Sequence, residues 1–435
     1  MTLRVLLAVL PSLVVAIPSF NINLTAAPEV RWKGVTKYFR KDGLAALNEM
    51  QKRLKSSFSE EDVHNWVQGL KQERPEEEDY KRELKGIAKD LTLNDPWNEH
   101  DMYEKLLLFN AVYELEFSTG CSGLLAADLN GTVVHGRNLD FNFPYQMPDG
   151  SWHNWEDLTF NAVFYRDNIN IQHKDDMEHQ EDVMVAPMFA FVTGMHTGMR
   201  FGGWSFQQNT RHTNDHKKNL KELMNGGRIF PWTARYLLQH VKSFEEASKK
   251  LQSFHWAAPQ YFVLGGAGQF EGAVITAGRG TETLNGETPP VQRIRNETGH
   301  WKLLQTNDDP NKESSDLRKP LGEMVLGLQQ QKDVSSGFMW DNMLAPELKM
   351  ESTVLTFVSI PQTGYWFTTL KDELRPLEQY YSIERMHRRY PPQHYPAPEY
   401  SDTTHKGSTS EVQTENASTK NVGATKWARR ALLSE

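Results

Sequence analysis

Cys121 is the only cysteine in this chain of 435 residues, and this fact limits how the chain can fold. One thiol cannot form a disulfide within the chain, so a packed core has to hold the fold together. The composition supplies such a core, because 38% of the residues are hydrophobic and the sequence contains 12 Trp and 21 Phe. At about 150 residues per domain, two or three domains are expected.

The charge balance argues against a nucleic-acid-binding protein. Lys and Arg number 48 against 56 Asp and Glu, which gives a net charge of −8 with neutral histidines. Proteins that bind nucleic acids carry a basic surface instead. Protonation of all 15 histidines would move the net charge to +7, so its sign reverses at low pH. An anionic membrane surface is therefore expected to attract the protein only under acidic conditions.

The first 16 residues are typical of a secretory signal peptide. Arg4 supplies the positive end, Val5–Ala16 is a short apolar run, and Ala16 is small enough for cleavage after it. The run is shorter than the ~20 residues that span a bilayer, and no other stretch is comparably apolar. We therefore expect a soluble or peripheral protein of the secretory pathway. Four glycosylation sequons agree with this, at Asn23, Asn130, Asn296 and Asn416.

A single thiol in such a protein calls for an explanation. Secreted chains of this size usually carry disulfides, and an unpaired thiol is a liability in an oxidising compartment. Cys121 is therefore a candidate nucleophile. The alternative is that Cys121 is a small buried hydrophobic residue without a chemical role.

The composition divides the chain into four parts. Residues 1–16 are the signal peptide, and residues 17–120 are mostly helical and strongly charged. Residues 121–390 carry short β runs with helical patterns between them, and residues 391–435 form a disordered tail rich in Pro, Ser, Thr and Asn. Strands between helical layers predict a layered α/β or α+β domain for the third part.

Three segments of the second part have helical patterns. Residues 27–58 carry apolar side chains at helical spacing. Residues 76–90 are mixed in charge and poor in apolar side chains, which indicates a solvated helix or loop. Residues 97–116 carry a broad apolar set, which predicts a buried helix leading towards Cys121.

The third part alternates strands and helices. The candidate strands are residues 122–129, 132–141, 161–165, 183–193, 261–264, 272–277, 302–305, 354–359 and 365–370. Helices are predicted over residues 230–241, after a capping box that starts at Ser243, and over residues 320–330.

The Asn130-Gly131 pair predicts a tight hairpin that brings a carboxylate beside Cys121. A two-residue turn there pairs residues whose numbers sum to 261, so Cys121 would face Asp140 directly. Arg137 would then lie on the other face of the ladder, unless a bulge at Gly136 turned it back.

A carboxylate beside a thiol raises the pKa of the thiol, so Asp140 is better suited to hold an amine. Cleavage between Gly120 and Cys121 would give Cys121 a free α-amino group with an ordinary pKa of about 7.7–8.0. That amine could serve as the base for the thiol of the same residue, which is the N-terminal-nucleophile arrangement. The alternative is that Asp140 and Arg137 form an ordinary salt bridge at a strand end.

Other patterns carry less weight. His135 or His196 could form a dyad with Cys121, but strand histidines are more often structural. The glycines of residues 265–268 are not followed by the Lys-Ser/Thr of a phosphate-binding loop, so a turn between strands is expected. No cluster has metal-ligand spacing, so neither a metal nor another cofactor is expected.

Four separated motifs resemble the acid ceramidase and N-acylethanolamine acid amidase family. Cys121-Ser-Gly and the His-Gly-Arg-Asn-Leu-Asp-Phe run of residues 135–141 resemble its nucleophile hairpin. The other motifs are residues 20–32, 257–276 and 301–308, in the family's order, and the resemblance extends to about residue 375. The Ala-Ala-Pro-Glu run of residues 26–29 and the single cysteine favour the acid amidase branch.

The resemblance implies an α+β fold, the αββα sandwich of N-terminal-nucleophile hydrolases, with a helical N-terminal chain packed on it. It implies that Cys121 is the self-exposed nucleophile and base, and that Asp140 orients its amine. Arg137 would position the nucleophile and the substrate carbonyl, and the Asn307 side chain would donate to the oxyanion.

The segment Asn209, Thr210 and Arg211 lies where the family tends to have Asn-Glu-Arg, which implies a secondary role at the site. Thr210 stands where relatives have an acidic residue that contributes to self-cleavage, which bears on the rate of maturation. Ser122 replaces the usual Thr, and Asp308 replaces an aromatic residue after the asparagine.

These features predict a lysosomal or secreted glycoprotein that hydrolyses N-acylethanolamines with saturated acyl chains after self-cleavage at Gly120–Cys121 into two chains. Ceramide is the alternative substrate. A catalytically silent lipid-binding protein is the alternative of another class, and Thr210 supports it. The family's helices touch membranes, so the apolar helices before Cys121 and around residues 230–238 either contact lipid or belong to the core.

Overall fold

The computed structural model describes residues 17–93, 95–116, 120–167, 180–211, 215–280, 291–297, 299–309 and 316–370. They belong to one compact unit that ends by Pro392. The predicted signal peptide, the predicted tail and Asn416 lie outside the described residues.

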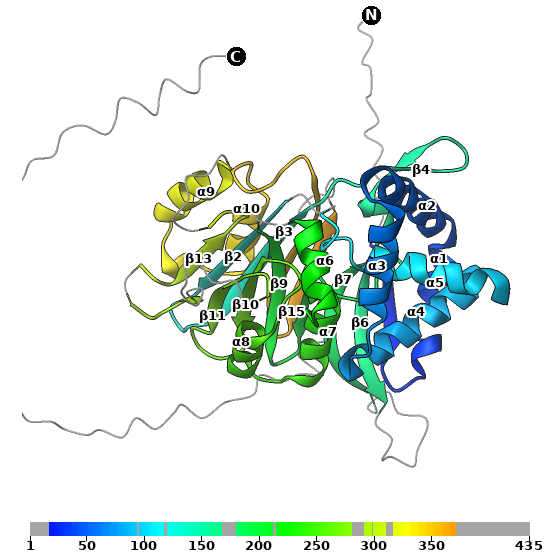
Figure 1. Ribbon diagram of the computed structural model, residues 1–435. Helices are drawn as coiled ribbons and strands as arrows, with labels where there is room; N and C mark the ends of the chain where they lie inside the picture. The colour runs from blue at the N-terminus through cyan, green and yellow to red at the C-terminus, as the bar shows by residue number, and fades with distance from the viewer. Residues whose placement is uncertain are drawn as a thin grey trace, which may run out of the picture. The chain divides into compact units, whose positions relative to one another are not determined.

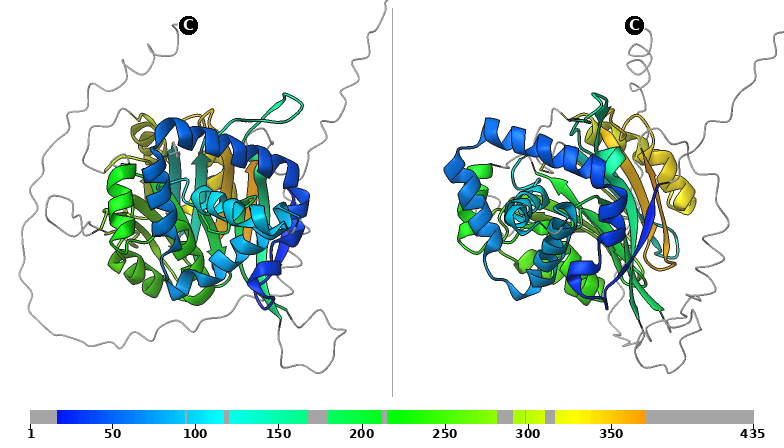
Figure 2. Two further views of the ribbon diagram at one scale, coloured as in Figure 1. Left: turned by 45° about the vertical axis from the view of Figure 1, so that its right-hand side comes forward. Right: turned by 90° about the vertical axis from the view of Figure 1, so that its right-hand side faces the viewer.

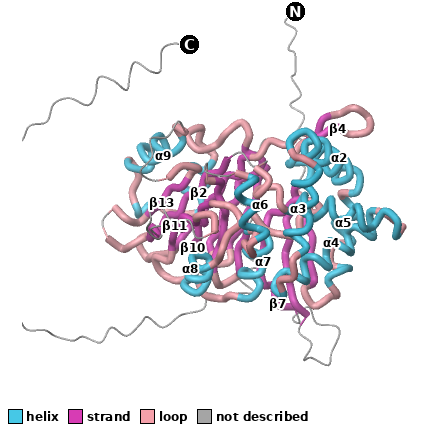
Figure 3. Tube along the Cα trace, viewed as in Figure 1, coloured by secondary structure: helices cyan, strands magenta, loops and turns pink. Residues whose placement is uncertain are grey.

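Two sheets form the centre of this unit, with helices on the outside (Figure 3). The eight-stranded sheet has the order β1-β6-β7-β8-β9-β10-β11-β12, and the five-stranded sheet has the order β13-β2-β3-β14-β15. The first sheet comprises β1 Ser19–Asn23, β6 Thr159–Asp167, β7 Gln180–Phe189, β8 Thr197–Arg200, β9 Trp204–Thr210, β10 Gln260–Gly266, β11 Gly272–Ala277 and β12 Val291–Arg293. The second comprises β13 Lys302–Gln305, β2 Gly120–Ala127, β3 Val133–Asp140, β14 Thr353–Ile360 and β15 Tyr365–Leu370. A small third sheet pairs β4 Tyr145–Gln146 with β5 Trp152–His153.

The helices make this arrangement an αββα sandwich of the α+β class. The helices are α1 Lys33–Tyr38, α2 Arg40–Ser57, α3 Glu60–Lys71, α4 Glu78–Leu91, α5 Pro96–Asn110, α6 His216–Met224, α7 Phe230–His240, α8 Phe244–Ser253, α9 Arg318–Gly327 and α10 Ser336–Met343. Helices α7 and α8 contact the eight-stranded sheet, while α9 and α10 contact the five-stranded sheet. The two sheets contact each other through β2, β3, β9 and β10. Helices α1 to α5 gather beside β6 and β7 (Figure 1; Figure 2).

The alternation of side chains along β2 determines what each face of this strand meets. Leu125 and Ala127 pack between the two sheets against Val263 of β10. Leu124 and Ala126 pack on the opposite face, in a cluster with residues of α9 and α10. Since side chains alternate along a strand, Cys121 shares the inward face with Leu125.

The predicted two-residue turn of this hairpin is wrong by one residue. The ladder pairs Cys121 with Leu139 and Gly120 with Asp140. The loop between the strands is a three-residue one, closed by a hydrogen bond of 3.0 Å from Asp128 N to the Thr132 carbonyl. Asp128 Oδ1 also accepts hydrogen bonds of 2.8 Å from the backbone N–H groups of residues 130 and 132. This side chain stabilises the longer loop, in which Gly131 has φ +85°.

Because the register is shifted by one residue, each side chain of β3 lies on the face of the sheet opposite to the one expected. Arg137 lies opposite Gly123 and therefore on the inward face that carries Cys121, so no bulge at Gly136 is needed. Asp140 lies opposite Gly120, on the face that points towards α9. The expected direct pairing of Asp140 with Cys121 is therefore replaced by a pairing with the residue before the predicted cleavage site.

Most predicted strands are present with small changes at their ends, and the helical predictions are modified in three places. The segment 27–58 is divided into α1 and α2, and the helix predicted over 97–116 ends at Asn110. Residues 76–90 contain α4, which is not solvated, because Tyr80, Leu84 and Ile87 bury one face of it. Three apolar residues at positions i, i+4 and i+7 form a stripe that can be buried, even in a helix with many charged side chains.

Of the two alternatives for the apolar helices before Cys121 and around residues 230–238, lipid contact or core, the structure supports the core. Leu106, Leu107 and Leu108 are buried, and so are Trp232 and Leu237. Within the described ranges no helix is long and apolar enough to cross a membrane.

Candidate active site

The Cys121 thiol is buried between the sheets, with 1% of the residue exposed. Arg137 Nη2 donates to Cys121 Sγ at 3.4 Å, and Arg137 Nη1 donates to the carbonyls of His196 and Gln208 at 2.8 and 3.0 Å. These two carbonyls hold the guanidinium in place. The structure therefore brings Arg137 and Cys121 together. The shifted register of the hairpin does this, and not a bulge at Gly136.

The thiol is in its protonated form in the uncut chain. Burial raises the pKa of Cys121, which the Arg137 charge lowers and the Asp140 charge raises. The thiol therefore needs a base before it can attack a carbonyl.

Asn307 binds the peptide unit that leads into Cys121. The Cys121 backbone N–H donates to Asn307 Oδ1 at 2.9 Å, and Asn307 Nδ2 donates to the Thr210 carbonyl at 2.8 Å. Asn307 follows β13, which pairs with β2, so the ladder brings this side chain to the start of β2. Asn307 is completely buried, and both ends of its amide are used in the uncut chain.

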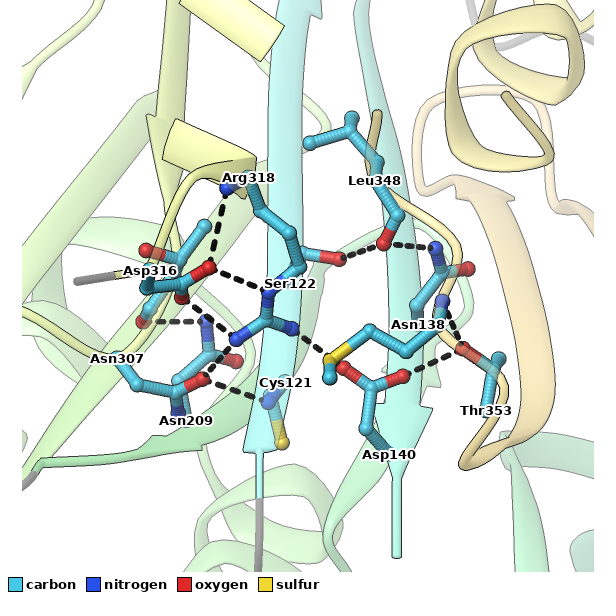
Figure 4. A network of polar contacts seen from close by, with 12 residues as sticks. Cys121, Ser122, Asn138, Asp140, Asn209, Asn307, Asp316, Arg318, Leu348 and Thr353 are labelled. Atoms are coloured by element: carbon cyan, nitrogen blue, oxygen red, sulfur yellow. Dashed lines mark hydrogen bonds and ion pairs between the residues drawn. The ribbon is translucent and has the colours of Figure 1, made fainter. Parts of the chain in front are cut away.

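Arg318, at the start of α9, joins Asn307 to Asp140. Arg318 Nη2 donates to Asn307 Oδ1 at 2.7 Å, and Arg318 Nη1 lies 2.5 Å from Asp140 Oδ2. Asp316 binds the same guanidinium at 2.7 Å, and Thr353 Oγ1 donates to Asp140 Oδ1 at 2.6 Å. Figure 4 shows Arg318 between Asn307 and Asp316 on one side and Asp140 on the other. We did not predict Arg318, Asp316 or Thr353, because no local sequence signal marks them.

The Asp140 carboxyl titrates in the mildly acidic range. Burial raises its pKa to about 6, against the opposing effects of the Arg318 charge and the Thr353 hydrogen bond. A small change of pH around 6 therefore changes the charge next to Gly120.

The three predicted secondary residues hold the segment that carries Asn307. Asn209 Nδ2 donates to the carbonyls of Gln305 and Thr306 at 2.8 and 3.2 Å. Arg211 forms two hydrogen bonds of 2.9 and 3.0 Å with the Asp309 carboxylate. Together with the Thr210 carbonyl, which accepts from Asn307, these contacts fix residues 305–309 on both sides of Asn307.

An apolar cavity lies beside the residues that pair with Cys121 and hold Arg137. It is lined by Val112, Tyr113, Leu139, Phe141, Trp155, Phe189, Val192, His196 and Gln208. Leu139 is the direct cross-strand neighbour of Cys121, and the His196 and Gln208 carbonyls hold Arg137. Val112 and Tyr113 come from the chain segment just before the predicted cleavage site, so that segment forms one wall.

The two histidines considered for a dyad are structural. Burial lowers the pKa of both His135 and His196 to about 3, so neither ring is charged. The His135 ring bonds to Ser205 Oγ and Gln207 Oε1 at 2.8 and 2.9 Å. The His196 ring packs against Phe230.

The remaining sequence patterns can also be placed. Gly265 and Gly266 end β10, and the expected turn to β11 follows over residues 267–271, where Gly268 N donates to the Glu271 carboxylate at 2.8 Å. In the part of the chain that the structure describes, no group of three His, Cys, Asp or Glu residues could hold a metal ion. Among the sequons, Asn130 and Asn296 are exposed and Asn23 is half-buried.

No protein-family model matches the chain. The chain is similar to the acid ceramidase of Homo sapiens, with 28% identity over 376 residues that cover 82% of this chain and 87% of that protein. The acid ceramidase of Pan troglodytes is 30% identical over 304 residues, 67% of this chain and 70% of that protein. Among solved structures, the Caenorhabditis elegans ortholog of N-acylethanolamine-hydrolyzing acid amidase covers 55% of this chain and 93% of its own, with 21% identity and a TM-score of 0.45.

The similarity to the acid ceramidases runs through most of the chain. It includes the hairpin that carries Cys121 and Arg137, which the structure places in contact. The acid ceramidases show the family of this chain, and the more distant solved structure is not needed for it. The chain belongs to the acid ceramidase and N-acylethanolamine acid amidase family, a family of N-terminal-nucleophile cysteine amidohydrolases.

Proposed function

We propose that the protein is a lipid amidase that activates itself by cleaving its Gly120–Cys121 peptide bond. One observation carries the proposal: two separate groups hold the two reacting parts of Cys121. Arg137 binds its sulfur at 3.4 Å, and Asn307 binds its backbone N–H at 2.9 Å. A buried structural cysteine needs neither contact.

This geometry supports self-cleavage. The Cys121 sulfur attacks the Gly120 carbonyl carbon, and the thiol proton passes to the departing Cys121 nitrogen, so a thioester replaces the peptide bond. Water then hydrolyses the thioester and leaves a carboxylate on Gly120 and a free amine on Cys121. Asp140 lies opposite Gly120 in the ladder, so a carboxylate is close to the new amine.

Turnover uses the same groups. The free amine takes the thiol proton, so Cys121 supplies both the nucleophile and its base. The thiolate attacks the acyl carbonyl, and the Asn307 amide with a backbone N–H stabilises the oxyanion. The amine product leaves, and water hydrolyses the acyl thioester. Asn307 Nδ2 has to turn from the Thr210 carbonyl to the substrate in this step.

The substrate that we propose is an N-acylethanolamine, cleaved to a fatty acid and ethanolamine. The lining of the cavity beside Leu139 is apolar, which supports a fatty acyl chain as its ligand, but the cavity has to widen to admit one because it now holds little more than a water molecule. We propose a lysosomal or secreted location for the mature glycoprotein, supported by the signal-peptide pattern of residues 1–16 and by the exposed sequons at Asn130 and Asn296. Ceramide is the second candidate, favoured by the names of the curated relatives.

The test is incubation of purified protein at acidic pH, followed by mass spectrometry and assays against an ethanolamide and a ceramide. We expect a fragment that begins at Cys121 and amidase activity that appears with it. Cys121→Ala should stay uncut and inactive, with unchanged circular dichroism. Full activity of an uncut wild-type chain would contradict the mechanism, and lipid binding without turnover would support the silent lipid-binding alternative.

A further inference from the structure

A completely buried ion pair joins α4 to α7. Glu83 and Arg235 are both 0% exposed, and their side chains form two contacts of 2.5 and 2.8 Å. Trp32 Nε1 donates to Glu83 Oε2 at 2.7 Å, and Arg31 Nη1 donates to Glu83 Oε1 at 3.0 Å. Both carboxylate oxygens of Glu83 are therefore satisfied by donors, as a buried charge requires.

The guanidinium of Arg235 is equally well enclosed. It lies 5.4, 4.6 and 5.0 Å from the ring centroids of Trp32, Tyr80 and Phe164. Arg235 Nη1 also donates to the Thr193 carbonyl at 2.7 Å. Among the described residues Glu83 is the carboxylate that pairs with Arg235, so the buried Arg235 charge depends on it, whereas Glu83 also pairs with Arg31 at 3.0 Å.

The partners of this cluster lie on opposite sides of the Gly120–Cys121 bond. Glu83, Trp32 and Tyr80 come before the bond, whereas Arg235 and Phe164 come after it. The cluster therefore connects the two fragments that cleavage would produce. Cys121 is the only cysteine, so no disulfide can hold them together.

A second buried contact extends this connection to the cavity. The Thr193 backbone N–H donates to Asn110 Oδ1 at 2.8 Å, and Asn110 Nδ2 donates to the Phe191 carbonyl at 2.9 Å. Asn110 ends α5, and Val112 and Tyr113 of the cavity wall follow directly. The same Thr193 thus contacts Arg235 through its carbonyl and Asn110 through its N–H.

We propose that the Glu83–Arg235 cluster is the anchor that keeps the N-terminal fragment in the cut protein, and that this fragment remains one wall of the substrate cavity. The inference rests on the proposed function, because it concerns the cut form. Removal of one partner leaves an uncompensated buried charge, which is far more costly than the loss of a surface pair. The Lys41–Asp149 pair also joins the two fragments, at 3.4 Å, but its side chains are 63% and 60% exposed. Such a pair contributes little.

The anchor can be tested without relying on self-cleavage. A protease recognition sequence replaces residues 117–119 in Cys121→Ala protein, so that an added protease makes the cut. The cut protein and its Glu83→Gln variant are diluted and analysed by size-exclusion chromatography. We expect the parent to elute as one particle, and the fragments of Glu83→Gln to dissociate with an equilibrium constant at least about 100-fold larger.

The matched control is Lys41→Gln, which should leave the fragments as tightly associated as in the parent. Arg235→Lys keeps the positive charge and loses the paired geometry, and it replaces Glu83→Gln where the latter does not fold before cutting. Association as tight as in the parent, in whichever of these two variants is folded before the cut, would overturn the anchor.

Activity gives a second readout in the self-cleaved enzyme with its native Cys121. We expect Glu83→Gln to lose amidase activity on dilution and to regain it on concentration, whereas the wild-type specific activity stays constant. Dissociation of the N-terminal fragment removes the cavity wall formed by Val112 and Tyr113, which should raise KM more than it lowers kcat. A wild-type chain that remains uncut on a denaturing gel would refute the proposed function alone. Separation of the protease-cut parent would refute the anchor alone.

Discussion

At the scale of single residues, the site depends on Arg318, which binds Asn307 and Asp140 at once. We expect Arg318→Gln to slow self-cleavage by about 100-fold, since it removes the donor that holds the Asn307 amide. The rate at which the Cys121 fragment appears on a denaturing gel measures this. Lys319→Gln, at the next position of α9, serves as the control. Cleavage at the wild-type rate in Arg318→Gln would show that Asn307 needs no such support.

Glu114 is a buried carboxyl whose ionisation opposes folding. It is buried, its Oε1 accepts from Phe230 N at 3.0 Å, and its Oε2 has no hydrogen-bond partner among the described residues. Burial raises the pKa of Glu114 to about 8, above the ordinary value of about 4.3. The folded chain therefore keeps this proton longer than the unfolded chain, and its stability decreases as the pH rises from about 4 to 8.

We expect the unfolding temperature of the wild type to fall between pH 5 and pH 8, and that of Glu114→Gln to fall by at least about 2 °C less. The glutamine keeps the acceptor for Phe230 N without the buried charge. Scanning fluorimetry across this range measures both proteins, with Glu323→Gln on exposed α9 as control. Parallel pH profiles for wild type and Glu114→Gln would rule out this account.

The sequence led to four of the residues that meet at the site. The hairpin pattern and the family resemblance pointed to Cys121, Arg137, Asp140 and Asn307, and the structure brings them together. Arg318 and Thr353 could not be predicted, because they meet Asp140 across 178 and 213 residues of chain. Contacts at such separations depend on the packing of α9 and β14, which no local pattern encodes.

At the scale of elements, β2 has to approach β9 closely. A Cβ atom at Gly123 would lie 2.2 Å from Gln207 Nε2, which itself donates to Asn209 Oδ1 at 2.6 Å. We expect Gly123→Ala to lower the free energy of unfolding by about 1–3 kcal/mol, as overpacking does. Chemical denaturation measures this. Gly327→Ala is the matched control, since no atom lies within 4 Å of its Cβ position, and a similar loss there would contradict the explanation.

Strand β9 also shows why some elements escaped prediction. Its sequence from Trp204 to Thr210 contains Gln207, Gln208 and Asn209, all buried. Buried polar side chains in a strand do not give the hydrophobic alternation by which strands are recognised. The hairpin of β2 and β3 was recognised, but its register was not, because Asp128 stabilises a longer loop than Asn-Gly alone indicates.

At the scale of the whole molecule, the net charge predicts pH-dependent binding to membranes. The charge of −8 with neutral histidines moves towards positive values as the histidines other than the buried His135 and His196 become protonated. We expect more binding to vesicles that contain phosphatidylserine at pH 5 than at pH 7.5, measured by sedimentation. Salt should weaken this binding, and vesicles of phosphatidylcholine alone are the control. Equal binding at both pH values would exclude the charge reversal as its cause.

The parallel pairing of β1 with β6 bears on whether the chain folds before or after the proposed cut. Strand β1 lies before the Gly120–Cys121 bond and β6 lies after it, so in the uncut chain the two strands are tethered and find each other at a rate independent of concentration. Once the bond is broken, their encounter becomes a second-order reaction. In the mechanism that we propose, folding therefore has to precede cutting, and a cut molecule that unfolds in dilute solution is lost.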